Sequence, residues 1–348
     1  MWTENEIFRA DLESLCSCGY IPWGELNGKT VLITGGTGLI GYTVTSALAY
    51  RSLTRGEKIR LLLPVRSEER ARERYAAHLA DGCDIRFLPG SVEDLPEPDG
   101  PVDYIIHGAS PTASRRFTEY PAETARTILI GTENMLSLAR RKAVSGMVFL
   151  SSMEVYGEIA DRRVLREEDL GAVDLFSPRS VYPEGKRMAE NLCCAYYSEY
   201  GVPVTAARLC QTFGPGVSAE DGRVFAYMAR CALSGEDIRL STPGTKENMY
   251  LYTADAAGAI LLLLLRGKRG AAYSVGNPDT YCSVKEMGEL VARTLGERRM
   301  SVLTGTGDSA GIYPPDTYLR LDISRMRSLG WRPSVNLEEM FRRMTACF

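Results

Sequence analysis

The sequence predicts an α/β fold built on a doubly wound parallel sheet, because short apolar runs alternate with helical patterns through its first half. The runs have no polar face, which is typical of strands that are buried on both sides of a sheet. Between them, apolar residues recur at helical spacing, so helices are expected to cover both faces. The runs are Val31–Thr34, Ile59–Val65, Ile85–Leu88, Tyr104–His107 and Met147–Ser151, and the helical stretches are Tyr42–Arg51, Glu68–Ala80 and Pro121–Lys142.

The second half of the chain has a looser pattern and predicts a smaller C-terminal α+β lobe. A long helical stretch, Arg179–Tyr200, precedes an apolar strand, Val204–Leu209, and a glycine–proline turn at 214–216, which marks a break in regular structure. Short strands are expected among the helices that follow. Those helices are predicted at Val224–Leu233, Ala254–Leu265, Val284–Leu295 and Asp322–Leu329.

These patterns divide the chain into three parts. Residues 1–27 are expected to form an added N-terminal helix, and residues 28–175 form the sheet domain. Residues 176–348 form mainly the smaller lobe. Because Val204–Leu209 has the character of a buried parallel strand, some segments of this last part are expected to return to the sheet.

Composition describes a soluble globular chain of 348 residues, of which 45% are hydrophobic and 24% charged. Such values exclude wholesale disorder, and a net charge of −3 argues against a general nucleic-acid binder. The longest apolar stretch, Ala256–Leu265, is too short to cross a bilayer, and the acidic N-terminus does not fit an export signal. We therefore expect a cytoplasmic protein without membrane or nucleic-acid partners. Nine cysteines predict reduced thiols, and with only two histidines no metal site is expected.

A glycine-rich turn follows the first predicted strand directly. Gly35, Gly38 and Gly41 are spaced three apart between that strand and the next helix. Glycines there let the backbone turn tightly and approach a pyrophosphate, which then lies against free N–H groups at the helix N-terminus. The turn predicts that the sheet domain is of the Rossmann type and binds a dinucleotide. Three further residues of the turn are expected at the cofactor: Thr37, Leu39 and Ile40.

The end of the second strand bears on which nicotinamide dinucleotide binds. An acid there would hold the 2′-hydroxyl of the adenosine ribose in NAD, whereas an arginine suits the 2′-phosphate of NADP. This strand runs into Arg66 and Ser67 and has no acid. Arg66 is therefore a candidate cofactor residue, and NADP stays open beside NAD.

A serine, a tyrosine and a lysine after the fifth strand form a candidate proton-transfer site. Tyr182 and Lys186 are four residues apart and follow Ser152, so they lie one turn apart on one face of a helix. A lysine ammonium there would favour the phenolate and pull the tyrosine pKa below its reference value of about 10. Such a tyrosine can take a proton from a carbinol while hydride leaves the same carbon for nicotinamide. A second pair with this spacing, Tyr281 and Lys285, has no serine-ended parallel strand before it and is rejected.

With these motifs the chain resembles the extended short-chain dehydrogenase/reductase family, whose members epimerise, dehydrate, decarboxylate or reduce nucleotide sugars. The resemblance implies an enzyme with a nucleotide-sugar substrate and NAD as cofactor, contacted also by Gly108 and Ala109. It further implies a homodimer that pairs the helices Pro121–Lys142 and Arg179–Tyr200. The resemblance covers residues 29–344 and rests, beside the turn and Ser152, Tyr182 and Lys186, on the segments His107–Ser110, Gly131–Asn134, Ser151–Gly157, Asp322–Ser324 and Leu329–Pro333.

Within that family the chain is most similar to UDP-glucuronate decarboxylases, in residues 182–190, 212–215, 221–224 and 275–278. Glu154 matches an acid found in decarboxylases and in 4,6-dehydratases. The dehydratases place an aspartate just before that glutamate, whereas this chain has Met153, which cannot donate a proton. The resemblance thus implies transient oxidation at C4 of the sugar and loss of carbon dioxide. The catalytic residues would be Ser152, Glu154, Tyr182 and Lys186.

Two positions depart from the pattern of the decarboxylases. The family usually has an arginine for the substrate diphosphate seven residues before the aspartate that matches Asp255, and this chain has Asn248 there. Gln211 replaces an asparagine but still offers an amide. Arg223 and Arg320 are candidates for the missing positive charge, and with Gln211 they are the expected substrate-binding residues.

Three functions therefore stay open. The first is a nucleotide-sugar decarboxylase that recycles NAD. The second is a nucleotide-sugar 4-epimerase or an NADPH-dependent 4-keto-sugar reductase, the reductase being favoured by Arg66. The third is a non-catalytic regulator that senses dinucleotides, although a sensor has no need for the pair formed by Tyr182 and Lys186.

Overall fold

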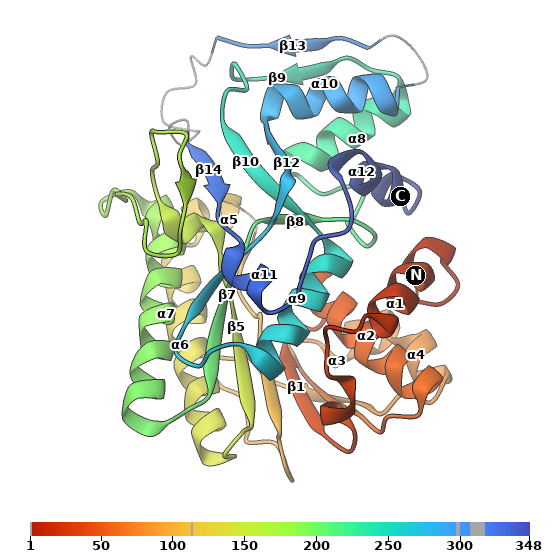
Figure 1. Cartoon of the computed structure of the whole chain (residues 1–348), viewed down its shortest axis with the longest axis vertical. Helices are drawn as coiled ribbons and strands as arrows, with labels where there is room; N and C mark the ends of the chain where they lie inside the picture. Colours follow the sequence, from red (N-terminus) through yellow and green to blue (C-terminus); the bar gives the residue numbers. More distant parts are fainter. Residues whose placement is uncertain (1, 113, 297–299, 307–316) are drawn as a thin grey trace.

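A computed structural model describes residues 2–112, 114–296, 300–306 and 317–348, and its centre is a parallel sheet of seven strands. Their order is β11-β7-β5-β4-β1-β2-β3, and every neighbouring pair runs parallel. The predicted doubly wound α/β sheet is thereby confirmed (Figure 1). The strands are β1 (Thr30–Thr34), β2 (Arg60–Val65), β3 (Ile85–Pro89), β4 (Tyr104–His107), β5 (Gly146–Ser152), β7 (Val204–Leu209) and β11 (Ala272–Val275).

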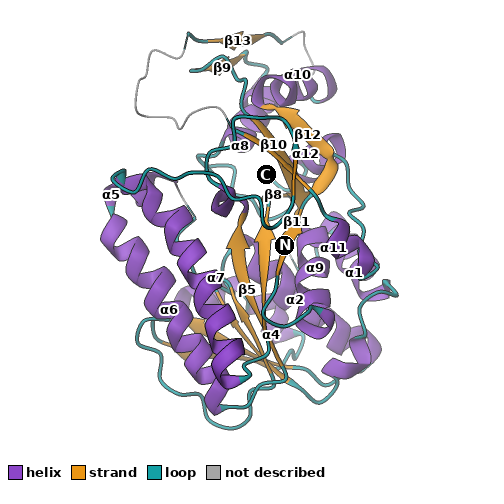
Figure 2. Ribbon diagram, turned by 60° about the vertical axis from the view of Figure 1, so that its left-hand side comes forward, coloured by secondary structure: helices purple, strands orange, loops and turns teal. Residues whose placement is uncertain are grey.

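Helices cover both faces of this sheet (Figure 2). On one face α2 (Leu39–Arg55) packs against α9 (Thr253–Arg266), and on the other α6 (Pro121–Arg141) packs against α7 (Val181–Tyr200). The remaining helices beside the sheet are α1 (Glu6–Ser17), α3 (Glu68–Arg74), α4 (Ala76–Ala80), α5 (Ser114–Glu119) and α11 (Ser324–Ser328).

The single helix expected over Glu68–Ala80 is wrong, because the structure breaks it at Tyr75 into α3 and α4. Tyr75 has φ −104° and ψ 12°, outside the helical geometry. Its ring is fully buried, and its hydroxyl donates to the Gly36 carbonyl at 2.5 Å. The local helical pattern therefore yields to a tertiary contact with the glycine-rich turn.

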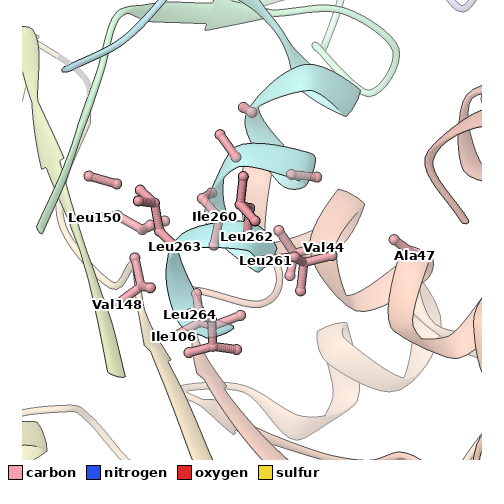
Figure 3. Close-up of a cluster of buried hydrophobic side chains, with 14 of the residues drawn as sticks. Val44, Ala47, Ile106, Val148, Leu150, Ile260, Leu261, Leu262, Leu263 and Leu264 are labelled. Carbon is pink, nitrogen blue, oxygen red and sulfur yellow. The ribbon is translucent and has the colours of Figure 1, made fainter. Parts of the chain in front are cut away.

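The apolar run Ala256–Leu265 lies in α9 and is buried along its whole length. Its leucines pack between α2 and the sheet, where they meet Val44, Ile106 and Val148 (Figure 3). A helix that is apolar all round belongs inside a core, which explains this stretch. Of the helices within the described residues, none has the length and apolar character needed to span a bilayer.

The second lobe is built on a small mixed sheet with helices against it. Five strands form it: β6 (Val164–Leu165), β8 (Gln211–Phe213), β10 (Glu247–Tyr252), β12 (Asn277–Ser283) and β14 (Tyr318–Leu321). Two further strands, β9 (Ile238–Leu240) and β13 (Val302–Thr304), pair with each other. The helices of the lobe are α8 (Val224–Ser234), α10 (Val284–Thr294) and α12 (Leu337–Thr345).

The C-terminal part differs from the sequence prediction in two helices. The helix expected over Asp322–Leu329 shortens to α11, because Asp322 accepts the Ser324 N–H and so turns the chain just before the helix. Helix α12 was not predicted, although Asn336 caps its first turn and Leu337, Met340, Phe341 and Met344 form one buried face. Its spacing is that of an amphipathic helix.

The N-terminal helix expected before Gly28 is present as α1, and it contacts both α2 and α9. Its buried Asp11 accepts hydrogen bonds from Tyr252 of β10 at 2.5 Å and from Arg343 of α12 at 2.7 Å. The added helix therefore ties the sheet domain to the C-terminal lobe.

Candidate active site

A cleft of about 800 Å³ opens at the carboxyl ends of the parallel strands, where doubly wound sheets bind their ligands. It is lined from one side by the ends of β1, β2, β4, β5 and β7 and from the other by residues of the second lobe. Every predicted site residue except Arg320 lines it. They are Gly35, Thr37, Gly38, Leu39, Ile40, Gly41, Arg66, Gly108, Ala109, Ser152, Glu154, Tyr182, Lys186, Gln211 and Arg223.

The three glycines of the turn have different physical roles. Gly35 has φ +72°, and a Cβ there would lie 2.8 Å from the Gly108 carbonyl carbon, so β1 and β4 approach closely only without a side chain. At Gly41 a Cβ would lie 2.8 Å from the Gly35 carbonyl carbon and nearer still to its oxygen. Gly38 has an ordinary φ of −79° and is the N-cap residue of α2. It lines the cleft, and because it has no side chain it leaves the N-terminus of α2 uncovered. Two glycines thus shape the turn, and the third leaves room for a ligand.

Gly38 therefore offers a variant that separates ligand binding from folding. A valine there would place methyl groups over the helix N-terminus, where a pyrophosphate is expected to lie, while the added Cβ would make a tight contact of 3.3 Å with the Gly35 carbonyl oxygen. We expect Gly38→Val to stay folded, with a small loss of stability, and to lose NAD binding. Calorimetric titration with NAD checks the affinity, and parent-like affinity would show that the pyrophosphate lies elsewhere.

A buried threonine and histidine, neither of them predicted, hold the β4 edge of the cleft. The Thr34 hydroxyl accepts the N–H groups of Gly108 and Ala109, both at 3.1 Å, and lies 2.7 Å from His107 Nδ1. Since Thr34 accepts twice, its own proton points to Nδ1, so His107 carries its proton on Nε2 toward Thr132. Burial, aided by the charge of Lys186, lowers the pKa of His107 to about 3, which keeps the ring neutral.

The serine, tyrosine and lysine of the predicted proton-transfer site lie together at the floor of the cleft. Tyr182 and Ser152 both line the cleft, and the Tyr182 ring stacks on Phe117 with centroids 4.2 Å apart and planes inclined by 9°. Lys186 is one turn along α7, and its Nζ donates to the Leu150 carbonyl at 2.8 Å. The two side chains share one helix face, as their spacing predicts.

The expected depression of the Tyr182 pKa is wrong for this structure. Burial raises the pKa of the phenol above its usual value, and the carboxylate of Glu154 raises it further, while Ser152 and Arg179 act in the opposite direction. Lys186 is itself affected by burial, which lowers its pKa to about 7. Its amine points to the Leu150 carbonyl, so the phenol is protonated at neutral pH in this state.

Glu154 reaches the cleft from a short 3₁₀ helix, Met153–Tyr156, directly after β5. Ser152 caps this helix by accepting the Glu154 N–H at 3.1 Å. The carboxylate forms an ion pair with Arg179 at 3.0 Å. Arg179 lies in the 3₁₀ helix Pro178–Ser180 before α7. The sequence analysis does not name it as a site residue, although its position three residues before Tyr182 indicates that it lies near the site.

The predicted substrate residues divide between the cleft and the outside. Gln211 of β8 and Arg223 both line the cleft, but Arg223 is already paired with Asp221 at 2.6 Å. Arg320 does not line it, which corrects the prediction. It lies on β14, is exposed, and its guanidinium lies 5.5 Å from the centre of the Tyr281 ring. Asn248 is buried in β10 and supplies no charge to the cleft.

Arg66 lies at the mouth of the cleft, at the end of β2, and is exposed. Within the described part of the chain no ion pair involves this guanidinium. Its position is compatible with the adenosine end of a dinucleotide bound across the glycine-rich turn.

Comparison with known proteins agrees with this geometry. A model of the NAD dependent epimerase/dehydratase family matches residues 31–276, which include the glycine-rich turn and the Tyr182–Lys186 pair. The chain belongs to this family. Membership confirms the predicted resemblance and the expectation of an enzyme, and the family description bears out NAD as the expected cofactor.

One relative by sequence and two solved structures illustrate what the chain is similar to. UDP-glucuronic acid decarboxylase 1 of Xenopus tropicalis is 32% identical over 318 residues, which are 90% of this chain and 71% of that protein. UDP-glucose 4-epimerase of Thermotoga maritima, solved with UDP-glucose, superposes with a TM-score of 0.75 at 22% identity and covers 92% of this chain and 98% of that one. UDP-glucuronic acid 4-epimerase of Bacillus cereus, solved with UDP-glucuronic acid and NAD, gives 0.74 at 17% identity, with coverage of 91% and 98%. At these identities the two structures show a shared fold.

Proposed function

We propose that this nucleotide-sugar enzyme decarboxylates UDP-glucuronate and that NAD is reduced and reoxidised within each turnover. The observation that carries the proposal is the arrangement of Glu154 beside Ser152 and Tyr182 in one cleft, with Met153 where a dehydratase has an acid. The relationship to the Xenopus decarboxylase supports the same substrate.

The residues that would hold NAD are those of the turn and of the strand ends. The Gly38 end of α2 would bind the pyrophosphate, Arg66 would lie at the adenosine ribose, and Tyr182 with Lys186 would lie at the nicotinamide. Bound there, NAD supplies an acceptor for hydride from C4 of the sugar and a donor that returns it. The missing Cβ at Gly38 leaves room for such a ligand at the N-terminus of α2.

Tyr182 would act on the proton of the C4 hydroxyl. For this the phenol must first release its own proton to solvent, which a charged Lys186 favours. The C4 hydroxyl proton would then move to the phenolate as hydride leaves C4, so that C4 becomes a ketone and the carboxylate at C6 becomes that of a β-keto acid. The C5–C6 bond then breaks and carbon dioxide leaves. The electron pair of that bond forms the C5=C4 double bond of an enolate, whose negative charge lies on the C4 oxygen. Glu154 would transfer to C5 the proton that this carbon must gain, and Tyr182 would return a proton to the C4 oxygen at the end. The product would be UDP-xylose.

Replacing Glu154 by glutamine separates this mechanism from a simple 4-epimerase or ketoreductase. If Glu154 transfers the proton to C5, Glu154→Gln still oxidises C4 but does not complete the later steps. The absorbance of reduced nicotinamide then rises and does not fall back to its starting value. In an epimerase or reductase the residue lies outside the chemistry, and the variant turns over nearly normally. Stopped-flow absorbance beside carbon dioxide release measures both. Glu158→Gln, four residues further on and outside the cleft lining, is the matched control.

A 4-epimerase or an NADPH-dependent 4-keto-sugar reductase is the second candidate. The exposed Arg66 at the cleft favours the reductase, because it could bind the 2′-phosphate of NADP. A purely dinucleotide-sensing regulator is disfavoured, because a sensor does not need Ser152, Tyr182 and Lys186 together in one cleft.

We further propose that the enzyme is a homodimer through α6 and α7. Part of the apolar surface of α7 is used within the chain, since Cys193 is buried and the Tyr196 hydroxyl bonds Ser137 at 3.0 Å. The same helix still exposes Met188, Tyr197 and Tyr200. Light scattering at micromolar concentration is expected to give twice the mass of the chain, and a monomer would contradict the proposal.

A further inference from the structure

One face of α7 carries three polar residues at four-residue intervals, Tyr182, Lys186 and Glu190, of which the first two line the cleft. Lys186 is only 3% exposed, and within the described ranges no carboxylate lies within ion-pair distance of its Nζ. Its amine donates to the Leu150 carbonyl and lies 4.7 Å from the centre of the Phe149 ring. A buried ammonium with so few partners is costly unless a negative charge lies near.

Glu190, one turn further along α7, can supply such a charge: its carboxylate binds the hydroxyl of Ser151, the residue after the Leu150 whose carbonyl accepts from Lys186. The side chain of Glu190 is 12% exposed, and Arg208 of β7 grips both oxygens, with Nε at 2.9 Å from Oε1 and Nη2 at 2.7 Å from Oε2. The Ser151 hydroxyl donates to Oε1 at 2.5 Å. Ser151 and Arg208 are themselves partners across β5 and β7. The carboxylate is therefore held in one place, one turn from Lys186.

We propose that Glu190 is a positioning residue that keeps Lys186 charged, by serving as its buried counter-ion from the same face of α7. The inference deepens the proposed function and rests on its assignment of Tyr182 and Lys186. Arg208 sets the position of Glu190, and Ser151 links that carboxylate to the strand end that carries Ser152.

The other groups facing Lys186 do not supply the negative charge. From β4 comes His107, which is neutral, and from β5 come the Leu150 carbonyl and the Phe149 ring. On α7 itself the Tyr182 phenol and the Cys193 thiol are both protonated, because burial raises their pKa values. The charge of Glu190 opposes the effect of burial on the pKa of Lys186.

The direction of the expected change follows from this. Replacing the carboxylate by a neutral amide removes the stabilisation of the ammonium, so Lys186 releases its proton at a lower pH. At neutral pH the amine is then largely uncharged and no longer favours the Tyr182 phenolate. The alkaline limb of the pH–rate profile should accordingly move to lower pH in Glu190→Gln.

An NMR titration of the lysine side-chain Cε signals in the NAD-free protein tests this directly, with Lys186→Arg to identify the resonance. We expect the Lys186 midpoint to fall by about one pH unit or more in Glu190→Gln, and to return toward the parent value in Glu190→Asp. Glu167→Gln is the matched control. Glu167 is also buried beside Arg208, which donates to its backbone carbonyl at 2.6 Å, but its carboxylate binds the Ser274 N–H and Arg325 instead. An unchanged midpoint in Glu190→Gln, or an equal fall in Glu167→Gln, would overturn the inference.

Removing Glu190 alone leaves the buried Arg208 unpaired, which is destabilising. The double variant Glu190→Gln/Arg208→Gln removes the negative charge together with the positive charge paired to it. We expect its Lys186 midpoint to lie between those of the parent and Glu190→Gln, and a midpoint at or above the parent value would also overturn the inference. Because the titration uses no substrate, its result is independent of the reaction. Failure of UDP-glucuronate to react would contradict the proposed function alone, whereas a fixed midpoint would contradict the counter-ion role alone.

Discussion

Tyr182→Phe is expected to lower turnover of UDP-glucuronate by about 10²–10⁴-fold, the range for loss of a general acid–base group. The variant deletes the phenol oxygen that exchanges the proton with the C4 hydroxyl. It keeps the ring that stacks on Phe117, so the fold and the affinity for NAD should stay close to those of the parent. Steady-state rates and calorimetric titration with NAD measure the two quantities on the same preparation.

The rejected pair at Tyr281 and Lys285 supplies the control for this variant. Tyr281 lies on β12, and its hydroxyl donates to Glu247 at 2.5 Å, outside the cleft lining. Tyr281→Phe should therefore turn over at the parent rate. Full activity in Tyr182→Phe, whatever sugar is the true substrate, would contradict the proton-transfer role of Tyr182 and the mechanism built on it.

Gly41→Ala is expected to destabilise the fold and to abolish NAD binding together. The added Cβ would meet the Gly35 carbonyl, which is backbone and cannot move aside as a flexible side chain could. Overpacking of this kind costs about 1–3 kcal/mol or more, and relief would require α2 to shift away from the turn. Chemical denaturation measures the loss in the free energy of unfolding, and calorimetry measures the loss of NAD affinity.

Gly24→Ala is the matched control for this effect, because nothing lies within 4 Å of a Cβ at that position. It should unfold and bind NAD like the parent. A Gly41→Ala protein with the stability of the parent would show that α2 and the turn adapt. Close packing against the Gly35 carbonyl would then not be the reason for glycine at position 41.

The sequence predicts the larger sheet well because its strands are apolar on both faces. Runs such as Val31–Thr34 and Tyr104–His107 reappear in the structure almost residue for residue. Elements that depend on distant partners are harder to predict. Strand β6 has only two residues and exists because β14, far along the chain, pairs with it. The helix break at Tyr75 likewise depends on a contact with Gly36.

The candidate site shows the same division. Residues in motifs that follow a strand directly, such as Ser152 and the turn glycines, all line the cleft. Arg320 was named only as a candidate for the missing positive charge, and alternation along β14 turns this side chain to solvent. Spacing also missed Arg179, His107 and Thr34, whose roles come from contacts across elements. The pKa of Tyr182 was expected to fall since spacing reports a neighbouring lysine but not the burial that outweighs it.

The central claim, decarboxylation of a nucleotide-bound hexuronate with recycling of NAD, is tested most directly by incubating the enzyme with UDP-glucuronate and NAD. Mass spectrometry of the nucleotide sugar, carbon dioxide release and nicotinamide absorbance are followed together. The account predicts a UDP-pentose and carbon dioxide in equal amounts, with no net accumulation of reduced NAD. A UDP-hexuronate epimer without carbon dioxide, or a 4-keto product formed with one reduced NAD per sugar, would contradict it.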